Sequence, residues 1–190
     1  WLVAIKTVFI SNGYINEEPL NELCKYISAA SINLKSFKES IYKDLNNGSL
    51  QPVLNTLKTL KENNIWTEII NLIIPTWTDD MDMIQEMCKW LVDNGFSDFP
   101  LHFSRFSPMY KLTNLIPTPI VTLEKAMKIA KLSGINYVYI GNLPGHDTEN
   151  TYCPKCKKLI ISRKGFTVLE NHIINNKCEY CEKNIAGIWE

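Results

Sequence analysis

Short apolar runs rich in β-branched residues alternate, through about residue 142, with segments in which apolar residues recur every three or four positions. Several of the runs are nearly continuous, which is typical of strands in a sheet that is covered on both faces. The pattern predicts five strands, at Lys6–Ser11, Ala30–Lys35, Trp66–Ile74, Leu101–Phe106 and Asn136–Gly141.

Helical segments separate these strands, and several carry a start or stop signal. The run Thr78-Asp79-Asp80 offers capping side chains to one helix, Thr122 can cap another, and Gly134 can end it. The predicted helices are Pro19–Ile27, Ser49–Asn63, Thr78–Asn94 and Thr122–Ser133.

Alternation of strand and helix at this spacing predicts right-handed βαβ units and a parallel sheet, and therefore an α/β fold. Five strands are too few to close an eight-stranded barrel. The first strand also begins almost at residue 1. We therefore expect the chain to be the later part of a larger α/β domain.

Two Cys-x-x-Cys pairs near the end of the chain carry its strongest chemical signal. Cys153 and Cys156 form the first pair, and Cys178 and Cys181 form the second. Two such turns that face each other complete a tetrahedron of thiolates, which suits Zn²⁺, or iron in a rubredoxin-like site. Two disulfides or unrelated thiols are the alternative, which the absence of any small secreted scaffold disfavours. Four sulfurs leave no open position, so the pattern predicts a structural site.

The residues around these pairs predict a small zinc-ribbon-like domain, at 147–190. Leu159–Leu169 reads as strand, turn and strand. His172 lies between the pairs and could replace a cysteine, but with four cysteines present we expect a surface or packing histidine. A ribbon of this size buries little apolar surface, so bound metal would supply much of its folding free energy.

Composition narrows the classes of function. Twenty basic and twenty acidic residues give zero net charge, without a long block of one sign. This disfavours nucleic-acid binding and a polybasic membrane patch. The start of the chain lacks the basic region and cleavage site of a signal peptide, so we expect a reducing cytoplasm. Cys24 and Cys88 lie in helical patterns and are interpreted as buried apolar thiols.

A series of short segments, spread over nearly the whole chain, resembles a known family. They are Phe9–Ile15, Ile32–Phe37, Leu72–Pro75, His102–Phe106, Tyr137–Asn142, Pro144–His146, Asn150–Pro154 and Ile185–Trp189. In this order they resemble the radical SAM member of the AmmeMemoRadiSam group, which is similar to pyruvate formate-lyase activating enzymes.

The resemblance implies a partial (β/α) barrel over residues 1–146, formed by the later strands of a TIM-like barrel. It also implies a [4Fe-4S] cluster that cleaves S-adenosylmethionine to a 5′-deoxyadenosyl radical, which abstracts hydrogen from a substrate. Such enzymes hold the cluster on a Cys-x3-Cys-x2-Cys loop, and none of the six cysteines here fits that spacing. We expect the first strands and the cluster loop to be absent from this chain, which would be inactive alone.

Four residues are carried over from the family as cofactor-binding candidates. Asn12 matches a strand-end Asn-Gly that approaches the cofactor, although the pair could equally form only a turn. Lys35 matches an Asp-Leu-Lys element and could contact a carboxylate of cofactor or substrate. The acidic position of that element is Asn33 here, so an acid role there is in doubt. His102 and Arg105 lie on a strand that contributes cofactor contacts.

Strand geometry limits these assignments. His102 and Arg105 are three apart, so on a regular strand they point to opposite faces, as Glu68 and Asn71 do. Arg105 could clamp a carboxylate, whereas His102 could be a core histidine. His146 follows the last strand, where α/β barrels place their sites, but a linker role is equally open.

Two hypotheses of function follow. The first is the later part of a radical SAM enzyme that acts on an unknown protein or small molecule. The alternative is a non-catalytic α/β scaffold whose zinc ribbon binds a protein partner. In either case the first strand should present an unpaired edge, so we expect self-association that buries Trp1, Val8 and Ile10.

Overall fold

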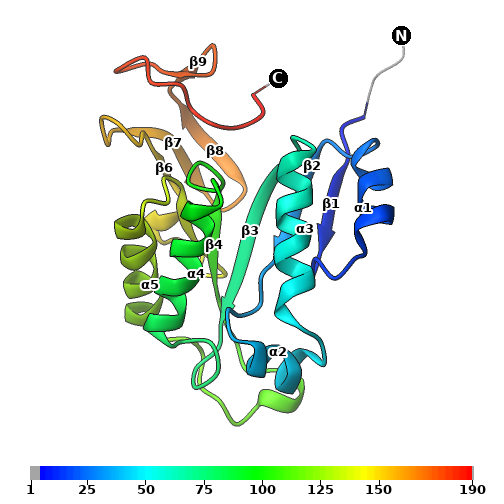
Figure 1. The fold of residues 1–190 in the computed structure, drawn as a ribbon. Coiled ribbons are helices and arrows are strands. Elements are labelled where there is room, and N and C mark those ends of the chain that lie inside the picture. The colour runs from blue at the N-terminus through cyan, green and yellow to red at the C-terminus, as the bar shows by residue number, and fades with distance from the viewer. Residues whose placement is uncertain (1–4, 190) are drawn as a thin grey trace. The chain divides into compact units, whose positions relative to one another are not determined.

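A computed structural model describes residues 5–189 and shows an α/β fold followed by a β-ribbon (Figure 1). Each of the five predicted strands is present, and no predicted end is wrong by more than two residues. The strands are β1 (Val8–Ser11), β2 (Ala29–Asn33), β3 (Trp66–Ile73), β4 (Leu101–Arg105) and β5 (Val138–Gly141).

Helices lie between these strands, and one of them was not predicted. The four predicted helices correspond to α1 (Glu17–Cys24), α3 (Leu50–Glu62), α4 (Met81–Asp93) and α5 (Ile120–Ser133). The additional helix is α2 (Glu39–Asn46), and a 3-10 turn follows β4 at Tyr110–Leu112. Helix α2 buries only Ile41 and Tyr42, so its apolar face is too short to give a clear periodic signal.

All four predicted helix starts differ from the observed ones by one to three residues, and for α4 and α5 the cap differs as well. The carboxylate of Asp80 caps α4 by accepting from the backbone N–H groups of Asp82 and Met83. Thr78 is not the cap, because its hydroxyl donates to Leu72 O and accepts from Ile74 N.

Helix α5 begins at Ile120, two residues before the predicted cap. Pro119 precedes the first helical residue with φ −60°, and its side chain makes no capping bond. Thr122 therefore lies inside the first turn. The predicted stop is confirmed, since Gly134 ends α5 in the left-handed region at φ 106°.

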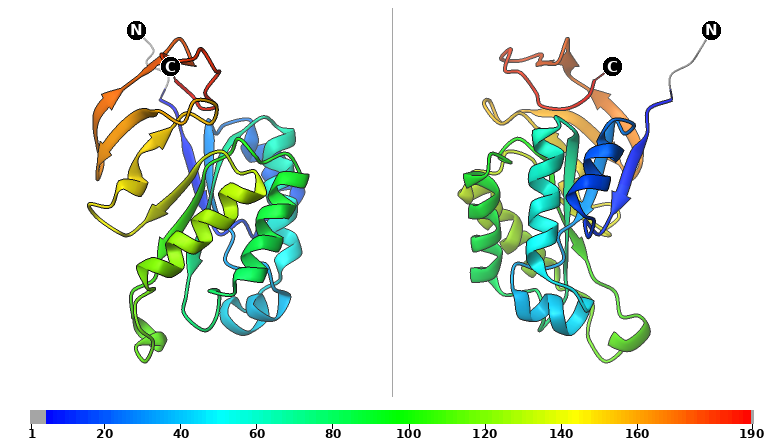
Figure 2. Two further views of the ribbon diagram at one scale, coloured as in Figure 1. Left: turned by 90° about the vertical axis from the view of Figure 1, so that its left-hand side faces the viewer. Right: turned by 45° about the vertical axis from the view of Figure 1, so that its right-hand side comes forward.

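The strand order in the sheet is β1-β2-β3-β4-β5. The chain forms two compact units, Trp1–Asn71 and Leu72–Glu190. In the first, β1 pairs in parallel with β2, and β2 with β3. In the second, β4 pairs in parallel with β5, and α5 runs beside α4 (Figure 2). These pairings confirm the predicted parallel α/β architecture.

Burial alternates along the strands rather than running continuously. In β3 every second residue is fully buried, while Glu68 and Ile70 are half-buried. In β2 the buried residues are Ala30 and Ile32. Helix α3 packs closely on this side, because a Cβ added at Gly13 would lie 2.9 Å from Ile32 and 3.1 Å from Val53 of α3. One face of the sheet is therefore packed against helices, and we call the other the half-buried face.

The C-terminal residues form the predicted ribbon. Strands β6 (Thr151–Tyr152), β7 (Leu159–Lys164) and β8 (Thr167–Asn171) make an antiparallel sheet, which confirms the strand-turn-strand reading (Figure 2). Strands β9 (Ile173–Ile174) and β10 (Lys177–Cys178) form a second small sheet. The domain division after residue 146 stays a prediction.

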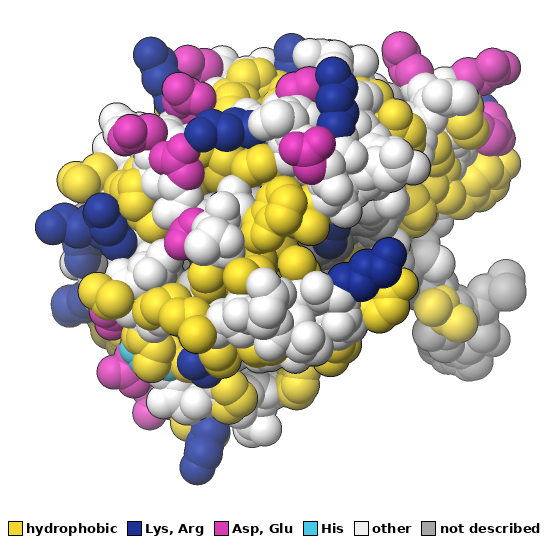
Figure 3. Space-filling model, turned by 90° about the horizontal axis from the view of Figure 1, so that it is seen from below, with side chains coloured by type: hydrophobic (Ala, Val, Ile, Leu, Met, Phe, Trp, Pro, Cys, Tyr) yellow, Lys and Arg dark blue, Asp and Glu magenta, His cyan; other side chains and the backbone are white. Residues whose placement is uncertain are grey.

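Two features of the described residues concern binding to membranes and to nucleic acids. Within residues 5–189, no helix combines the length and apolarity that crossing a membrane requires. On the face drawn in Figure 3, basic and acidic side chains are interspersed among apolar ones. This arrangement agrees with the zero net charge of the whole sequence.

Strand β1 ends the sheet, and its outer edge pairs with no strand among residues 5–189. Val8 and Ile10 are 61% and 73% exposed, whereas Phe9 between them is half-buried. Val8 and Ile10 therefore share the exposed side of this strand and Phe9 takes the other, while Trp1 lies outside the described residues.

We propose that this edge pairs with a second copy, and that Val8→Lys with Ile10→Lys prevents it. A lysine pair on an edge strand opposes strand addition through charge repulsion and lost apolar contact. Light scattering coupled to size-exclusion chromatography should give a dimer mass for the original chain and a monomer mass for the variant. Leu132→Lys, at a 78%-exposed position of α5, is the control and should remain dimeric. A monomeric original chain would contradict the proposal.

Candidate functional site

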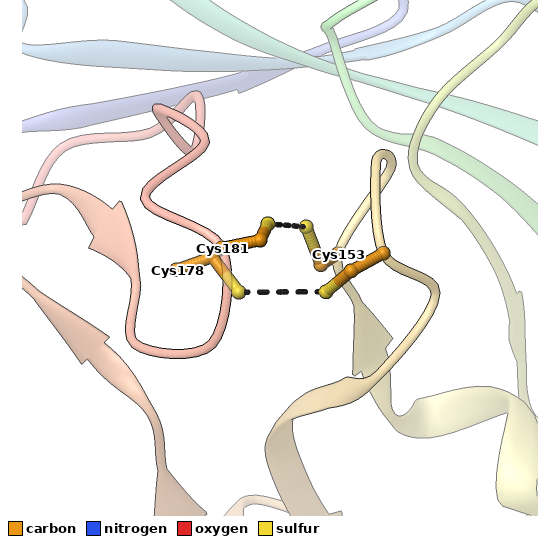
Figure 4. A group of neighbouring side chains, drawn as sticks. Cys153, Cys178 and Cys181 are labelled. Atoms are coloured by element: carbon orange, nitrogen blue, oxygen red, sulfur yellow. Dashed lines mark hydrogen bonds between the residues drawn. The ribbon is translucent and has the colours of Figure 1, made fainter.

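The four cysteines of the ribbon meet at one point, as Figure 4 shows. Cys153 Sγ lies 3.6 Å from Cys181 Sγ, and Cys156 Sγ lies 3.8 Å from Cys178 Sγ. All four sulfurs fall within 4.8 Å of one another. Metal–sulfur bonds of about 2.3 Å in a regular tetrahedron require sulfurs about 3.8 Å apart. The group therefore fits one four-coordinate ion and is too compact to enclose a two-iron cluster.

The two halves of this four-cysteine group have the same backbone design. Lys157 N donates to Cys153 O at 2.9 Å, and Glu182 N donates to Cys178 O at 2.9 Å. The residue after the second cysteine of each pair is left-handed, with φ 61° at Lys157 and 56° at Glu182. Non-glycine residues rarely adopt this conformation, because Cβ is crowded there. Each turn thus contains one residue in an unfavourable backbone conformation, and in this conformation the two sulfurs of the turn point toward a common centre.

Ionisation of the group is uneven. Burial raises the pKa of the Cys153 thiol, but backbone N–H groups of Cys156 and Lys155 donate to its sulfur and bring that pKa down to about 7. Burial raises the pKa of Cys178 to about 11. Metal binding to these thiols must displace protons, so binding weakens as pH falls.

The sulfurs are surrounded by apolar and aromatic side chains. Cys153 and Cys178 are fully buried with Ile160, Ile185 and Tyr137. Cys156 and Cys181 are half-buried. Tyr139 and Trp189 also pack against this core.

His172 is not among the metal-ligating groups found in the described part of the chain. Its Nδ1 lies 2.7 Å from Glu179 Oε2 and its Nε2 lies 3.4 Å from Glu170 Oε2. Hydrogen bonding to Glu179 and then Glu170 raises the pKa of the imidazole. The geometry agrees with a surface role for this histidine.

A second site lies in the first compact unit, at the carboxyl ends of β1 and β2. It is a cavity of about 290 Å³. Among the described residues that line it none is acidic, and Lys35 is the one basic side chain. The lining residues are Asn12, Tyr14, Lys35, Tyr42, Asn46, Asn47, Gly48 and Val53. An amine, amides and tyrosines without a carboxylate suit an anionic group.

Lys35 is the charged element of this cavity. Burial lowers the pKa of its amine. Its Nζ donates to Asn33 Oδ1 at 3.2 Å, so the family's acidic position supplies a neutral amide here. Its backbone N–H donates to Tyr42 Oη at 3.0 Å, and burial raises the pKa of Tyr42 to about 12. Because the half-buried amine of Lys35 has only a neutral amide as its hydrogen-bond partner, a bound anion would stabilise its charged form.

Asn12 serves a turn and also lines the cavity. Its Oδ1 accepts from Tyr14 N at 3.0 Å, which is the local bond expected of an Asn-Gly turn. Gly13 is left-handed at φ 74°. Asn12 can therefore form the turn and still be available to contact a ligand in the cavity.

His102 and Arg105 lie on β4 in the second unit. His102 is paired with Tyr139 of β5, and their rings stack with centroids 5.0 Å apart at 24°. Arg105 Nε donates to Thr118 O at 3.0 Å, and Thr118 Oγ1 donates to Ile73 O and accepts from Phe106 N. Arg105 therefore holds the loop after β4, a use that the sequence did not indicate.

The remaining candidates lie apart. Glu68 is on the half-buried face of β3, and Asn71 is fully buried with Nδ2 donating to Leu34 O at 2.8 Å. His146 lies in the loop after β5, with Nδ1 3.0 Å from Thr148 Oγ1 and Nε2 3.7 Å from Glu124 Oε1. These contacts stabilise the loop after β5 and do not indicate a catalytic role for His146.

Comparison with known proteins gives these sites a context. Residues 2–91 match the family described as the radical SAM superfamily. The chain is 43% identical over 180 residues to an uncharacterized protein of Methanocaldococcus jannaschii, an alignment that covers 94% of this chain and 53% of that protein. The chain thus spans about half the length of the curated relative it matches.

Two solved structures are similar to this chain in fold. A domain of pyruvate-formate lyase-activating enzyme from Bacteroides vulgatus has a TM-score of 0.61 at 12% identity, covering 73% of this chain and 82% of that one. SuiB from Streptococcus suis, bound to S-adenosylmethionine, has a TM-score of 0.58 at 14% identity, covering 73% and 33%. At these identities the likeness shows the fold alone.

Proposed function

We infer that this chain belongs to the radical SAM superfamily, and we propose that it is the later part of an enzyme of the AmmeMemoRadiSam group. The match over residues 2–91 carries this proposal. The parallel α/β sheet and its similarity in fold to a pyruvate-formate lyase-activating enzyme domain support it.

The residues present fit one end of the cofactor. When bound to a [4Fe-4S] cluster, S-adenosylmethionine is cleaved reductively to a 5′-deoxyadenosyl radical that abstracts a hydrogen atom. Lys35 would hold the methionyl carboxylate, because it offers a half-buried ammonium in a cavity without acidic groups. Asn12, on the rim of the same cavity, would donate from its side-chain amide.

The cluster does not fit this chain. Its six cysteines contain no Cys-x3-Cys-x2-Cys motif. Four of them form the compact single-ion group, and Cys24 and Cys88 are buried. The described cysteines therefore offer no cluster loop. We propose that the cluster ligands belong to sequence outside these 190 residues, and that this chain alone does not cleave S-adenosylmethionine.

Lys35→Gln is expected to weaken S-adenosylmethionine binding about tenfold or more. A charge-assisted hydrogen bond contributes about 1.5–3 kcal/mol, and about 1.4 kcal/mol corresponds to a tenfold change in Kd. Equilibrium dialysis with labelled S-adenosylmethionine measures the change. Lys38→Gln, at an exposed position nearby, is the matched control and should bind as the original chain does.

Decarboxylated S-adenosylmethionine provides the second arm of this test. It lacks the carboxylate that Lys35 would contact, so its affinity should be the same for the original chain and for Lys35→Gln. Equal losses for both ligands would show that the substitution only perturbs the cavity, and no loss for either would remove Lys35 from the cofactor site.

The missing cluster motif is also the observation that favours the second candidate function, a non-catalytic scaffold whose metal ribbon binds a protein partner. The two candidates differ in one respect that can be measured, because a scaffold gains nothing from binding S-adenosylmethionine. Absence of saturable binding at the Lys35 cavity would favour the scaffold.

A further inference from the structure

The metal ribbon holds two tyrosines that project from β5 and the residue before it. Tyr137 Oη accepts from Ala186 N at 3.3 Å, and Tyr139 Oη lies 2.9 Å from Thr151 Oγ1 of β6. Tyr137 belongs to the apolar core that contains Cys153 and Cys178, and Tyr139 packs against this core beside Cys156 and Cys181. The ribbon therefore contacts side chains that belong to the strand before it.

The contact at Thr151 is itself fixed from the other side. Arg163 of β7 donates from Nη1 to Thr151 Oγ1 at 2.6 Å and to Glu149 O at 3.0 Å. The backbone N–H of Arg163 donates to Asn150 Oδ1 at 2.7 Å. Thr151 is only 4% exposed, so its hydroxyl position depends on these partners rather than on water. Because Oγ1 accepts from Arg163, it can still share its own proton with Tyr139.

Tyr139 in turn places His102. The two residues are register partners on neighbouring parallel strands, so their side chains leave the sheet on the same face. Their rings are 5.0 Å apart at 24°, a stacked arrangement that fixes the plane of the imidazole. Any rotation of the Tyr139 ring would move the surface on which His102 rests.

We propose that the ribbon, closed by its metal ion, is the positioning device for His102. The path runs from the four-cysteine group through the shared apolar core to Tyr139, with Arg163 and Thr151 fixing the phenol oxygen. Metal occupancy thereby sets the orientation of His102 on the half-buried face of β4. The inference rests on the proposed function only for the role of His102 as a cofactor contact. How the imidazole is held is independent of that role.

Proton NMR of the metal-loaded chain tests the inference without any activity assay. The sequence has three histidines, so a His102→Gln spectrum identifies the His102 imidazole signals. A ring stacked on tyrosine is shifted upfield by the ring current. We expect this shift to shrink in Tyr139→Phe and Thr151→Val, which each remove one hydroxyl from the path, and on removal of the metal with a chelator.

Tyr152→Phe is the matched control, because it removes a neighbouring tyrosine hydroxyl from a side chain that is 42% exposed. Its His102 signals should stay where they are in the original chain. Metal content is measured for every variant, and if Thr151→Val fails to hold the ion, Tyr139→Phe decides the test. Unchanged His102 signals in Tyr139→Phe and in the metal-free chain would overturn the proposal. Normal S-adenosylmethionine binding by His102→Gln would instead remove only the cofactor role.

Discussion

The double variant Cys153→Ser, Cys178→Ser is expected to hold no metal, where the original chain holds about one ion. These are the two fully buried sulfurs, and serine oxygens are poor ligands for an ion that selects thiolates. Apparent binding free energies of structural zinc in small modules are about 10–16 kcal/mol, which is folding free energy for a ribbon of this size. Elemental analysis by mass spectrometry gives the stoichiometry and distinguishes zinc from iron.

The ribbon should loosen in the same variant. The amide of Ala186, which donates to Tyr137 Oη, reports on this by hydrogen exchange and should lose most of its protection. Cys24→Ser is the control, because Cys24 lies outside the sulfur group, and it should keep one ion and a protected Ala186. Full metal content in the double variant would refute the assignment of the four cysteines as a metal site.

The second large effect concerns activity. After anaerobic reconstitution with iron and sulfide and reduction with dithionite, the 190-residue chain is expected to form no 5′-deoxyadenosine from S-adenosylmethionine. The physical reason is that cluster irons need thiolates at a workable spacing, and the chain offers no such loop. Liquid chromatography with mass spectrometry detects the product down to a small fraction of one turnover.

The longer relative from Methanocaldococcus jannaschii, of which this chain covers 53%, is the positive arm under identical conditions. If the proposed function is right, it should form 5′-deoxyadenosine. Formation of the product by the 190-residue chain in proportion to its concentration would show that another set of ligands holds a cluster. No product from either protein would favour the scaffold.

Much of the fold could be predicted because its signals are local. Apolar runs such as Trp66–Ile74 mark strands whatever surrounds them, and the structure ends that strand at Ile73. The four-cysteine group was equally accessible, since Cys-x-x-Cys turns aim two sulfurs at one point by their own backbone geometry. Each of these features depends on residues that are close together in the sequence.

The remaining features depend on contacts between residues far apart in the sequence. Helix α2 has a weak pattern of its own, and Tyr42 gained its place beside Lys35 only through the tertiary structure. The bond from Arg105 to Thr118 and the stacking of Tyr139 on His102 join separate segments. Periodicity carries no information about such pairs, so the sequence could nominate His102 but not the residues that hold it.

The unequal burial of the four sulfurs should affect the rate of metal exchange and the affinity for the metal through different cysteines. Within each Cys-x-x-Cys turn the first sulfur is buried and the second is half-buried. A chelator or a competing ion would therefore approach the centre beside Cys156 and Cys181, which are the less buried cysteines. Cys153 and Cys178, which are enclosed by apolar side chains, would shield the ion from solvent. We therefore expect the second cysteine of each turn to govern the rate of metal exchange, and the first cysteine of each turn to govern the strength of metal binding.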